Sequence, residues 1–190
     1  MPGNVIRSFI AVPVPGSIAK AMANAAHEAF GDIDHIRMVN PRSMHLTLKF
    51  LGDMKKDVLD KIGDVLSDIA CRRSSFAVKA AGIGAFPNLK NPKVLFVPLT
   101  GETEALIDMA ARLEKALIPY GIDPEKISFK PHLTLGRVKA PKQLGLIRKR
   151  AKTFENVSFG DFRVEELILY RSDLRPEGAR YTPLAGARLG

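Results

Sequence analysis

Hydrophobic and polar residues alternate with a period of two in several short stretches of this chain, a pattern typical of half-buried β-strands. The clearest stretches are residues 44–51 and 132–138. Further strands are predicted at 5–14, 76–83, 93–99 and 164–170. The strands at 76–83 and 93–99 flank a loop rich in glycine, proline and asparagine, which predicts that they pair as a hairpin.

Other stretches place apolar residues at helical spacing. They predict helices from Ser17, as the capping residue, to about Phe30, after Asp53 to about Ala70, at 102–118, and a short basic helix at 141–152. The order strand, helix, strand, strand, helix, strand is expected to occur twice. This order predicts an α+β protein with mostly antiparallel sheets, built as two similar lobes with helices packed outside.

The length of 190 residues suits one substantial core better than two independent domains, so residues 1–190 are expected to form a single domain of two lobes. No apolar run approaches the ~20 residues that span a bilayer. Residues 1–14 lack the pattern of a secretory signal and are interpreted as a first strand. The single cysteine, Cys71, excludes an internal disulfide and indicates a reducing cytoplasm; it is expected to be partly buried near a helix end.

The formal net charge of +9 is concentrated in one part of the chain. No acidic residue occurs between Glu125 and Glu155, yet this stretch holds nine lysines and arginines and surrounds the predicted strand 132–138. A basic run alone is often only a solvated surface. Here it favours a polyanionic partner, because clustered cations gain affinity by releasing the counterions of phosphates.

The tetrapeptide His-Leu-Thr-Leu occurs twice, beginning at His45 and His132, and includes two of the four histidines. Strand alternation places each histidine and the threonine two residues later on one face, opposite the leucines; Lys49 would share the face of His45, and Phe50 the leucine face. The two copies are 87 residues apart (132 − 45), nearly half of the chain. We therefore expect the pairs to face each other across a cleft between two lobes.

Two facing histidines suit acid–base chemistry, because an imidazole with a pKa near 6.5 gives or accepts a proton around neutral pH. One would activate a water molecule and the other would protonate the leaving oxygen of a phosphodiester. Thr47 and Thr134 would donate hydrogen bonds to the phosphate. The chain lacks the clustered carboxylates or His/Cys spacing of a metal site, so metal-independent chemistry without a cofactor is predicted.

Several segments together resemble one known family. They are Arg7-Ser-Phe-Ile-Ala-Val, His45-Leu-Thr-Leu-Lys-Phe-Leu-Gly, Pro131-His-Leu-Thr-Leu-Gly-Arg and the closing Ser-x-Leu…Gly-x-x-Tyr segment within residues 169–181. Over most of its length the chain is similar to the two-histidine phosphoesterases, in particular to RNA 2′,3′-cyclic phosphodiesterases, historically called 2′-5′ RNA ligases.

The resemblance implies a bilobal fold with the active site in the central cleft and His45 and His132 as catalytic residues. It implies that Thr47 and Thr134 bind phosphate, that Arg137 contacts the substrate phosphate or nucleotide, and that Phe50 stacks on a base. Simple alternation puts Phe50 and Arg137 on the wrong face, so a bend or strand end is required near each.

The implied substrate is RNA ending in a 2′,3′-cyclic phosphate, such as a tRNA fragment, and the implied product is a 2′-phosphate. His132 would then be the base and His45 the acid that protonates O3′. A monomer is expected. Three alternatives stay open: reversible 2′-5′ RNA ligation, hydrolysis of a small cyclic nucleotide or a 2′-5′ oligoadenylate, and a noncatalytic RNA-binding module.

Overall fold

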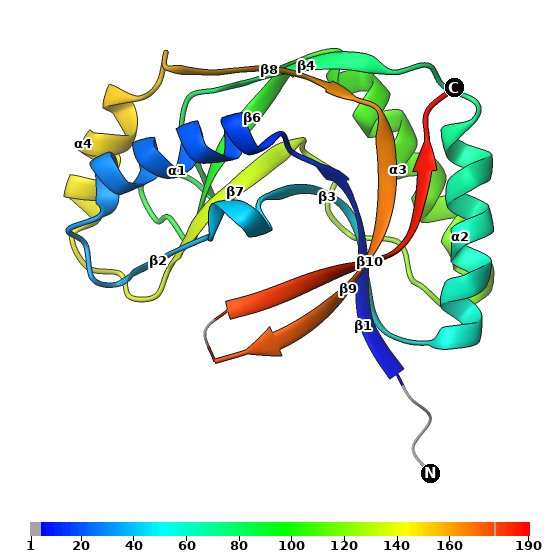
Figure 1. The fold of residues 1–190 in the computed structure, drawn as a ribbon. Coiled ribbons are helices and arrows are strands. Elements are labelled where there is room, and N and C mark those ends of the chain that lie inside the picture. Colours follow the sequence, from blue (N-terminus) through cyan, green and yellow to red (C-terminus); the bar gives the residue numbers. More distant parts are fainter. Residues whose placement is uncertain (1–4, 177) are drawn as a thin grey trace.

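The computed structural model describes residues 5–176 and 178–190, which form two antiparallel sheets covered by helices (Figure 1). The first sheet has the strand order β10-β9-β1-β3, with β1 Val5–Pro13, β3 His45–Lys55, β9 Glu166–Arg175 and β10 Gly178–Arg188. The second has the order β2-β7-β6-β4-β8, with β5 beside β6. Its strands are β2 Ile36–Met38, β4 Phe76–Ala81, β5 Gly84–Phe86, β6 Val94–Gly101, β7 His132–Val138 and β8 Ser158–Val164. The predicted α+β class with antiparallel sheets is confirmed.

The helices divide between the two sheets. They are α1 Gly16–Phe30, α2 Lys56–Ala70, α3 Thr103–Leu117 and α4 Leu144–Thr153. α2 packs on β9 and β10 and contacts α3, which lies against β3, while α1 contacts β7, β8 and α4. Each long helix buries an apolar stripe, such as Leu59, Ile62 and Leu66 of α2, which accounts for the helical periodicity of the sequence.

Two predicted boundaries were wrong. The N-cap of α1 is Pro15 without a side-chain hydrogen bond, and Ser17 lies inside the helix. The strand β3 does not end at Gly52 but continues to Lys55, because Gly52 adopts a φ of 72° within an irregular pairing with β1. A positive φ is readily adopted by glycine, so the strand bends there without stopping.

The chain passes repeatedly between the sheets. It places β1 in the first sheet, β2 in the second and β3 in the first, forms β4 to β8 in the second, and returns for β9 and β10. The predicted order of strands and helices is present from β1 to β4 but is not repeated afterwards, where β5 precedes β6 and the predicted basic helix, α4, lies between β7 and β8. Neither sheet is therefore made from one half of the chain.

The sequence expectations for individual side chains hold in part. Leu46, Leu48, Leu133 and Leu135 of the two motifs are buried in the core, as predicted. Cys71, expected to be partly buried, is exposed at the end of α2. In the described part of the chain, no helix is long and apolar enough to cross a lipid bilayer.

Candidate active site

The two repeated motifs form the first residues of β3 and β7, and these strands contact each other although they belong to different sheets. His45, Thr47, His132 and Thr134 are all half-buried, whereas the alternating leucines are buried. The histidine and threonine of each motif therefore share the strand face opposite the leucine core, as strand alternation predicted.

Both imidazoles make the same local hydrogen bond. His45 Nδ1 lies 2.8 Å from the carbonyl oxygen of Ser43, and His132 Nδ1 lies 2.6 Å from that of Lys130. A carbonyl oxygen only accepts, so each Nδ1 carries a proton and donates it. The Nε2 atom of each histidine is then left to accept a proton in the neutral ring or to donate one in the charged ring.

Aromatic rings hold both imidazoles in place. The ring of Phe9 stacks on His45 at a centroid distance of 4.6 Å, and Tyr181 meets His45 edge-on at 5.0 Å. On the other strand, Phe86 and Phe96 present ring edges and faces to His132 at 4.9 and 5.4 Å. These contacts limit imidazole rotation and remove water from one side of each ring.

Burial among these aromatic rings lowers the pKa of both His45 and His132 below its usual value of 6.5, because desolvation disfavours the charged imidazole. The hydrogen bonds to the Ser43 and Lys130 carbonyls raise the two pKa values, but by less than desolvation lowers them. At neutral pH the free protein therefore holds both imidazoles mainly in the neutral form.

The hydroxyl groups of Thr47 and Thr134 have no hydrogen-bond partner within residues 5–176 and 178–190, and neither is a buried unsatisfied atom. Each hydroxyl lies two residues along the strand from a histidine and on the same face. Both threonines can therefore donate a hydrogen bond to a ligand placed against the two imidazoles.

A bulge follows each motif and reverses the alternation of faces. The pairing of β3 with β1 skips Leu48, and the pairing of β7 with β6 skips Leu135. After the bulge Lys49 and Gly136 point into the core, whereas Phe50 and Arg137 are exposed. The structure thus contains the bend that both residues required, and they emerge on the histidine face.

Arg137 forms an electrostatic link between the sheets. Burial raises the pKa of the Tyr181 hydroxyl, and the positive charges of Arg137 and Arg7 partly oppose that rise. Tyr181 belongs to the first sheet and lies against His45, whereas Arg137 belongs to the second sheet and follows His132. The positive charge of Arg137 therefore reaches the ring beside His45 across the boundary between the two sheets.

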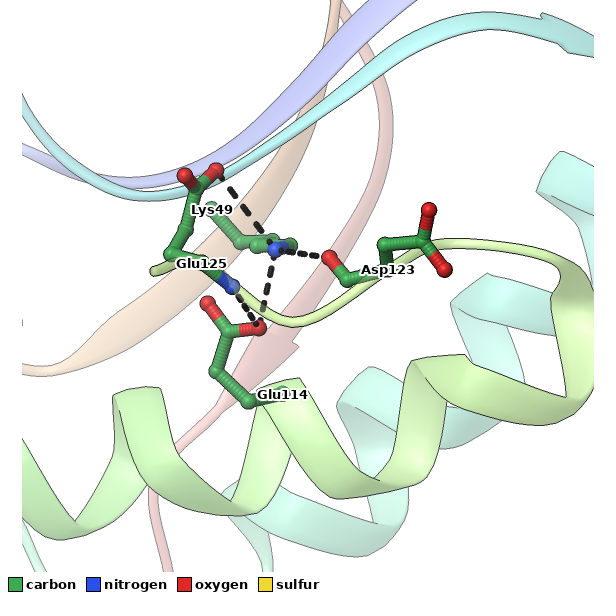
Figure 2. Close-up of polar contacts among 4 residues, drawn as sticks. All are labelled: Lys49, Glu114, Asp123 and Glu125. Carbon is green, nitrogen blue, oxygen red and sulfur yellow. Dashed lines mark hydrogen bonds and ion pairs between the residues drawn. The ribbon is translucent and has the colours of Figure 1, made fainter. Parts of the chain in front are cut away.

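Lys49, which strand alternation placed beside His45, is buried beneath the motif strand with only 3% of its surface exposed (Figure 2). Its Nζ atom donates to Glu114 Oε2 on α3 and to the backbone oxygen of Asp123, both at 2.8 Å, and lies 3.5 Å from Glu125 Oε1. The backbone N–H of Glu125 also donates to Glu114 Oε2. This cluster ties β3 to the segment that leads into β7.

Four further residues contact the site without having been predicted from the sequence: Phe9, Tyr181, Phe86 and Phe96. Phe9 and Tyr181 lie inside the segments that carried the family resemblance, which was the available signal. Phe86 and Phe96 come from strands with no motif. Among the described residues, no three His, Cys, Asp or Glu side chains are grouped so that they could hold a metal ion.

Comparison with known proteins agrees with this geometry. Residues 14–176 match the family model described as the 2′-5′ RNA ligase superfamily. The chain is 33% identical to a protein of Archaeoglobus fulgidus and 30% identical to one of Methanothermobacter thermautotrophicus, both named RNA 2′,3′-cyclic phosphodiesterase. These matches cover 94% and 97% of this chain and 98% and 99% of the relatives.

The fold is also similar to solved structures. The Thermus thermophilus protein TT0787 has a TM-score of 0.81 and 29% identity, and the match covers 97% of this chain and 98% of that one. Escherichia coli LigT, in a complex with 3′-AMP, has a TM-score of 0.77 at 24% identity over 98% of this chain and 99% of its own, which is evidence for the fold alone. With paired histidine motifs on contacting strands, the chain belongs to the 2′-5′ RNA ligase superfamily of two-histidine phosphoesterases.

Proposed function

We propose that this protein hydrolyses RNA 2′,3′-cyclic phosphate ends to 2′-phosphates, without a metal ion, by acid–base catalysis of His45 and His132. The observation that carries the proposal is that the two imidazoles make equivalent hydrogen bonds. Each donates from Nδ1 to the carbonyl oxygen two residues before it, which leaves Nε2 available to a ligand. The names of relatives about 30% identical to the chain support a cyclic phosphodiester as substrate.

In the proposed reaction, neutral His132 accepts a proton at Nε2 from a water molecule, whose oxygen attacks the phosphorus. The bond between phosphorus and O3′ breaks, and protonated His45 gives its Nε2 proton to O3′. The product carries a 2′-phosphate and a free 3′-hydroxyl. His132 ends with one proton more and His45 with one fewer, and exchange with solvent restores both.

The neighbouring side chains have compatible roles in this proposal. The free hydroxyls of Thr47 and Thr134 donate to non-bridging oxygens, where negative charge increases during attack. The Arg137 guanidinium binds the same phosphate, and the exposed ring of Phe50 stacks on the terminal base. The two sheets then act as the two lobes of one catalytic unit.

A second candidate activity is ring opening by a 5′-hydroxyl in place of water, which breaks the bond between phosphorus and O3′ and joins the two RNA ends by a 2′-5′ linkage. The name of the matching family model, the 2′-5′ RNA ligase superfamily, favours testing this activity. The same acid and base would run in reverse by microscopic reversibility, so an excess of a 2′-5′-linked RNA should yield cyclic ends and free 5′-hydroxyls. With no activating nucleotide, the equilibrium should lie toward hydrolysis in water.

The proposal is tested by incubating the protein with a short RNA that ends in a 2′,3′-cyclic phosphate, in the presence of a chelator, and separating 2′-phosphate from 3′-phosphate products. Formation of the 2′-phosphate is expected. His45→Ala and His132→Ala should each lower turnover by about 10² to 10⁴-fold, the usual contribution of a general acid or base. His27→Ala, on the exposed face of α1, is the matched control and should keep full activity.

Three results would contradict parts of the proposal. A 3′-phosphate product would exchange the acid and base roles. Loss of turnover with chelator, restored by a divalent cation, would exclude the metal-independent route. RNA binding that survives the double histidine variant without any product in the native protein would favour a noncatalytic RNA-binding module.

A further inference from the structure

Two arginines lie directly opposite each other on neighbouring strands of the second sheet. In the antiparallel pairing of β2 with β7, Arg37 is the partner of Arg137, and both side chains are exposed. Directly opposed residues have Cβ atoms ~4.5–5.5 Å apart, and like charges at such positions destabilise a sheet. This arrangement therefore has a cost to the fold that an anionic ligand would offset.

Arg37 lies on the same face of the sheet as Arg137. Its neighbours Ile36 and Met38 lie on the opposite face, since a Cβ on Gly136 would meet Met38 Sδ at 3.1 Å and Ile36 Cγ2 at 3.4 Å. Gly136 is buried and precedes exposed Arg137, so the two arginines share the other face, which is that of His132 and Thr134. Arg37 thus extends the candidate site toward the sheet edge.

Neither arginine forms an ion pair with any acidic residue within the described ranges, although other arginines of the chain do. Arg150 pairs with Asp32, and both Arg73 and Arg112 pair with Asp108. Arg37 and Arg137 therefore combine three properties: the same face, adjacent positions, and guanidinium groups that are not neutralised by a carboxylate. Such a pair suits two neighbouring phosphates of one RNA chain, because a guanidinium group binds a phosphate through paired hydrogen bonds.

We propose that Arg37 binds the phosphodiester that precedes the terminal nucleotide of the RNA, while Arg137 opposite it holds the reacting phosphate. This subsite rests on the proposed function, because it requires the cyclic phosphate to lie between the two histidines. Arg137 lies on β7 with His132, whereas Arg37 lies one strand farther out, on β2 at the edge of the second sheet. Arg37 is therefore a specificity residue that selects an RNA chain over a cyclic mononucleotide.

A double-mutant-type cycle of binding measurements, with two RNA ligands and two protein variants, tests the contact between Arg37 and the phosphodiester without any chemical step. The ligands are two trinucleotide RNAs with a 2′-phosphate end, one natural and one with a neutral methylphosphonate in place of the last internucleotide phosphate. Titrations by fluorescence anisotropy use the native protein and Arg37→Gln at fixed salt. The methylphosphonate should weaken binding to the native protein about tenfold, as for the loss of a charged hydrogen bond, and should have no further effect on Arg37→Gln.

The matched control is Arg188→Gln, which removes the same charge from the far end of β10. It should keep the native response to the methylphosphonate. An equal response to the methylphosphonate in the native protein and Arg37→Gln would overturn the contact. Such a result would leave Arg37 as a charge that only protects the short edge strand β2 from pairing with another chain.

Kinetics separate failure of the subsite from failure of the proposed function. For Arg37→Gln, the ratio of kcat/KM between a cyclic-ended trinucleotide and a cyclic mononucleotide should fall about tenfold, and Arg37→Lys should restore part of it. An unchanged ratio with lower turnover of both substrates would place Arg37 at the reacting phosphate and overturn the subsite. Should the native protein turn over neither substrate, the proposed function fails, and the binding cycle still decides the subsite.

Discussion

Phe50 and Arg137 occupy equivalent positions, each five residues after its motif histidine and immediately beyond a one-residue bulge. An aromatic ring on one strand thus corresponds to a guanidinium on the other. The residue before each also corresponds: Lys49 is buried and charged, whereas Gly136 leaves room for β2 to approach. The two motif strands share a backbone design but differ in the chemistry that they present, so the site is pseudo-symmetric in shape and asymmetric in function.

The pH optimum of kcat/KM, which reports the protonation states of the free protein, should lie on the acidic side of neutrality. Activity needs neutral His132 and protonated His45, and the pKa of each is lowered below 6.5 by burial. The maximum of kcat/KM is therefore expected below pH 6.5. A bound anionic phosphate favours the charged imidazole and raises the pKa of His45, so the basic limb of kcat should lie at higher pH than that of kcat/KM. Rate profiles from about pH 4.5 to 8.5 check this, and a kcat/KM maximum above pH 7 would contradict the acid role of His45.

Removal of either motif hydroxyl should slow the chemical step. Thr47→Val and Thr134→Val keep the strand-forming shape but cannot donate to the phosphate, and loss of one such donor lowers kcat by about 10²-fold. Thr→Ser at each position should recover most of the rate. The control is Thr182→Val, an exposed β10 threonine. Unchanged kcat in both motif variants would remove the threonines from the phosphate site.

Phe50→Ala should weaken RNA binding with little effect on folding. The ring is 58% exposed, so its removal costs little stability, whereas a base stacked on an aromatic side chain gains about 1–3 kcal/mol. We expect the Kd for a short 2′-phosphate-ended RNA to rise about tenfold and the melting temperature to change little. Ile107→Ala, an exposed apolar residue of α3, is the control and should leave Kd unchanged. An unaltered Kd in Phe50→Ala would mean that the exposed ring has no stacking role.

Lys49→Met should reduce the free energy of unfolding by about 1–3 kcal/mol, since it leaves the Asp123 carbonyl without its side-chain donor and Glu114 with only the backbone N–H of Glu125. The control is Lys56→Met, which breaks the exposed pair with Asp60 and should cost less than about 0.5 kcal/mol. Urea denaturation measures both. Equal effects in the two variants would show that the buried cluster is no more important to folding than a surface ion pair.

The sequence was sufficient for the features that depend on local patterns. Alternation located both motif strands and put His45 with Thr47 and His132 with Thr134, and helical spacing located the long helices. Local sequence patterns could not predict the two bulges, because a bulge is defined by how a strand pairs with its neighbour. Here β3 pairs with β1, and β7 pairs with β6. Alternation alone therefore placed Lys49 on the histidine face, although it is buried in the core. It placed Phe50 and Arg137 on the leucine face, and only the assumption of a bend brought them to the histidine face.

The surroundings of the histidines could not be predicted for the same reason. Phe9 lies 36 residues before His45 (45 − 9) and Tyr181 lies 136 residues after it (181 − 45), and the register of β1, β9 and β10 brings them together. The short strands β2 and β5 have only three residues each, too few for a periodic pattern. Arg37 on β2 carries no sequence signal and becomes visible only as the partner of Arg137.

The passage of the chain between the two sheets has a consequence for dissecting this protein. A cut anywhere from residue 56 to residue 131 separates β1 and β3 from β9 and β10, and also separates β2 from β7. Either fragment would hold one motif histidine and would expose unpaired strand edges in both sheets. The two fragments should therefore recover a common structure only on mixing, so that the motifs depend on a single cooperative folding event.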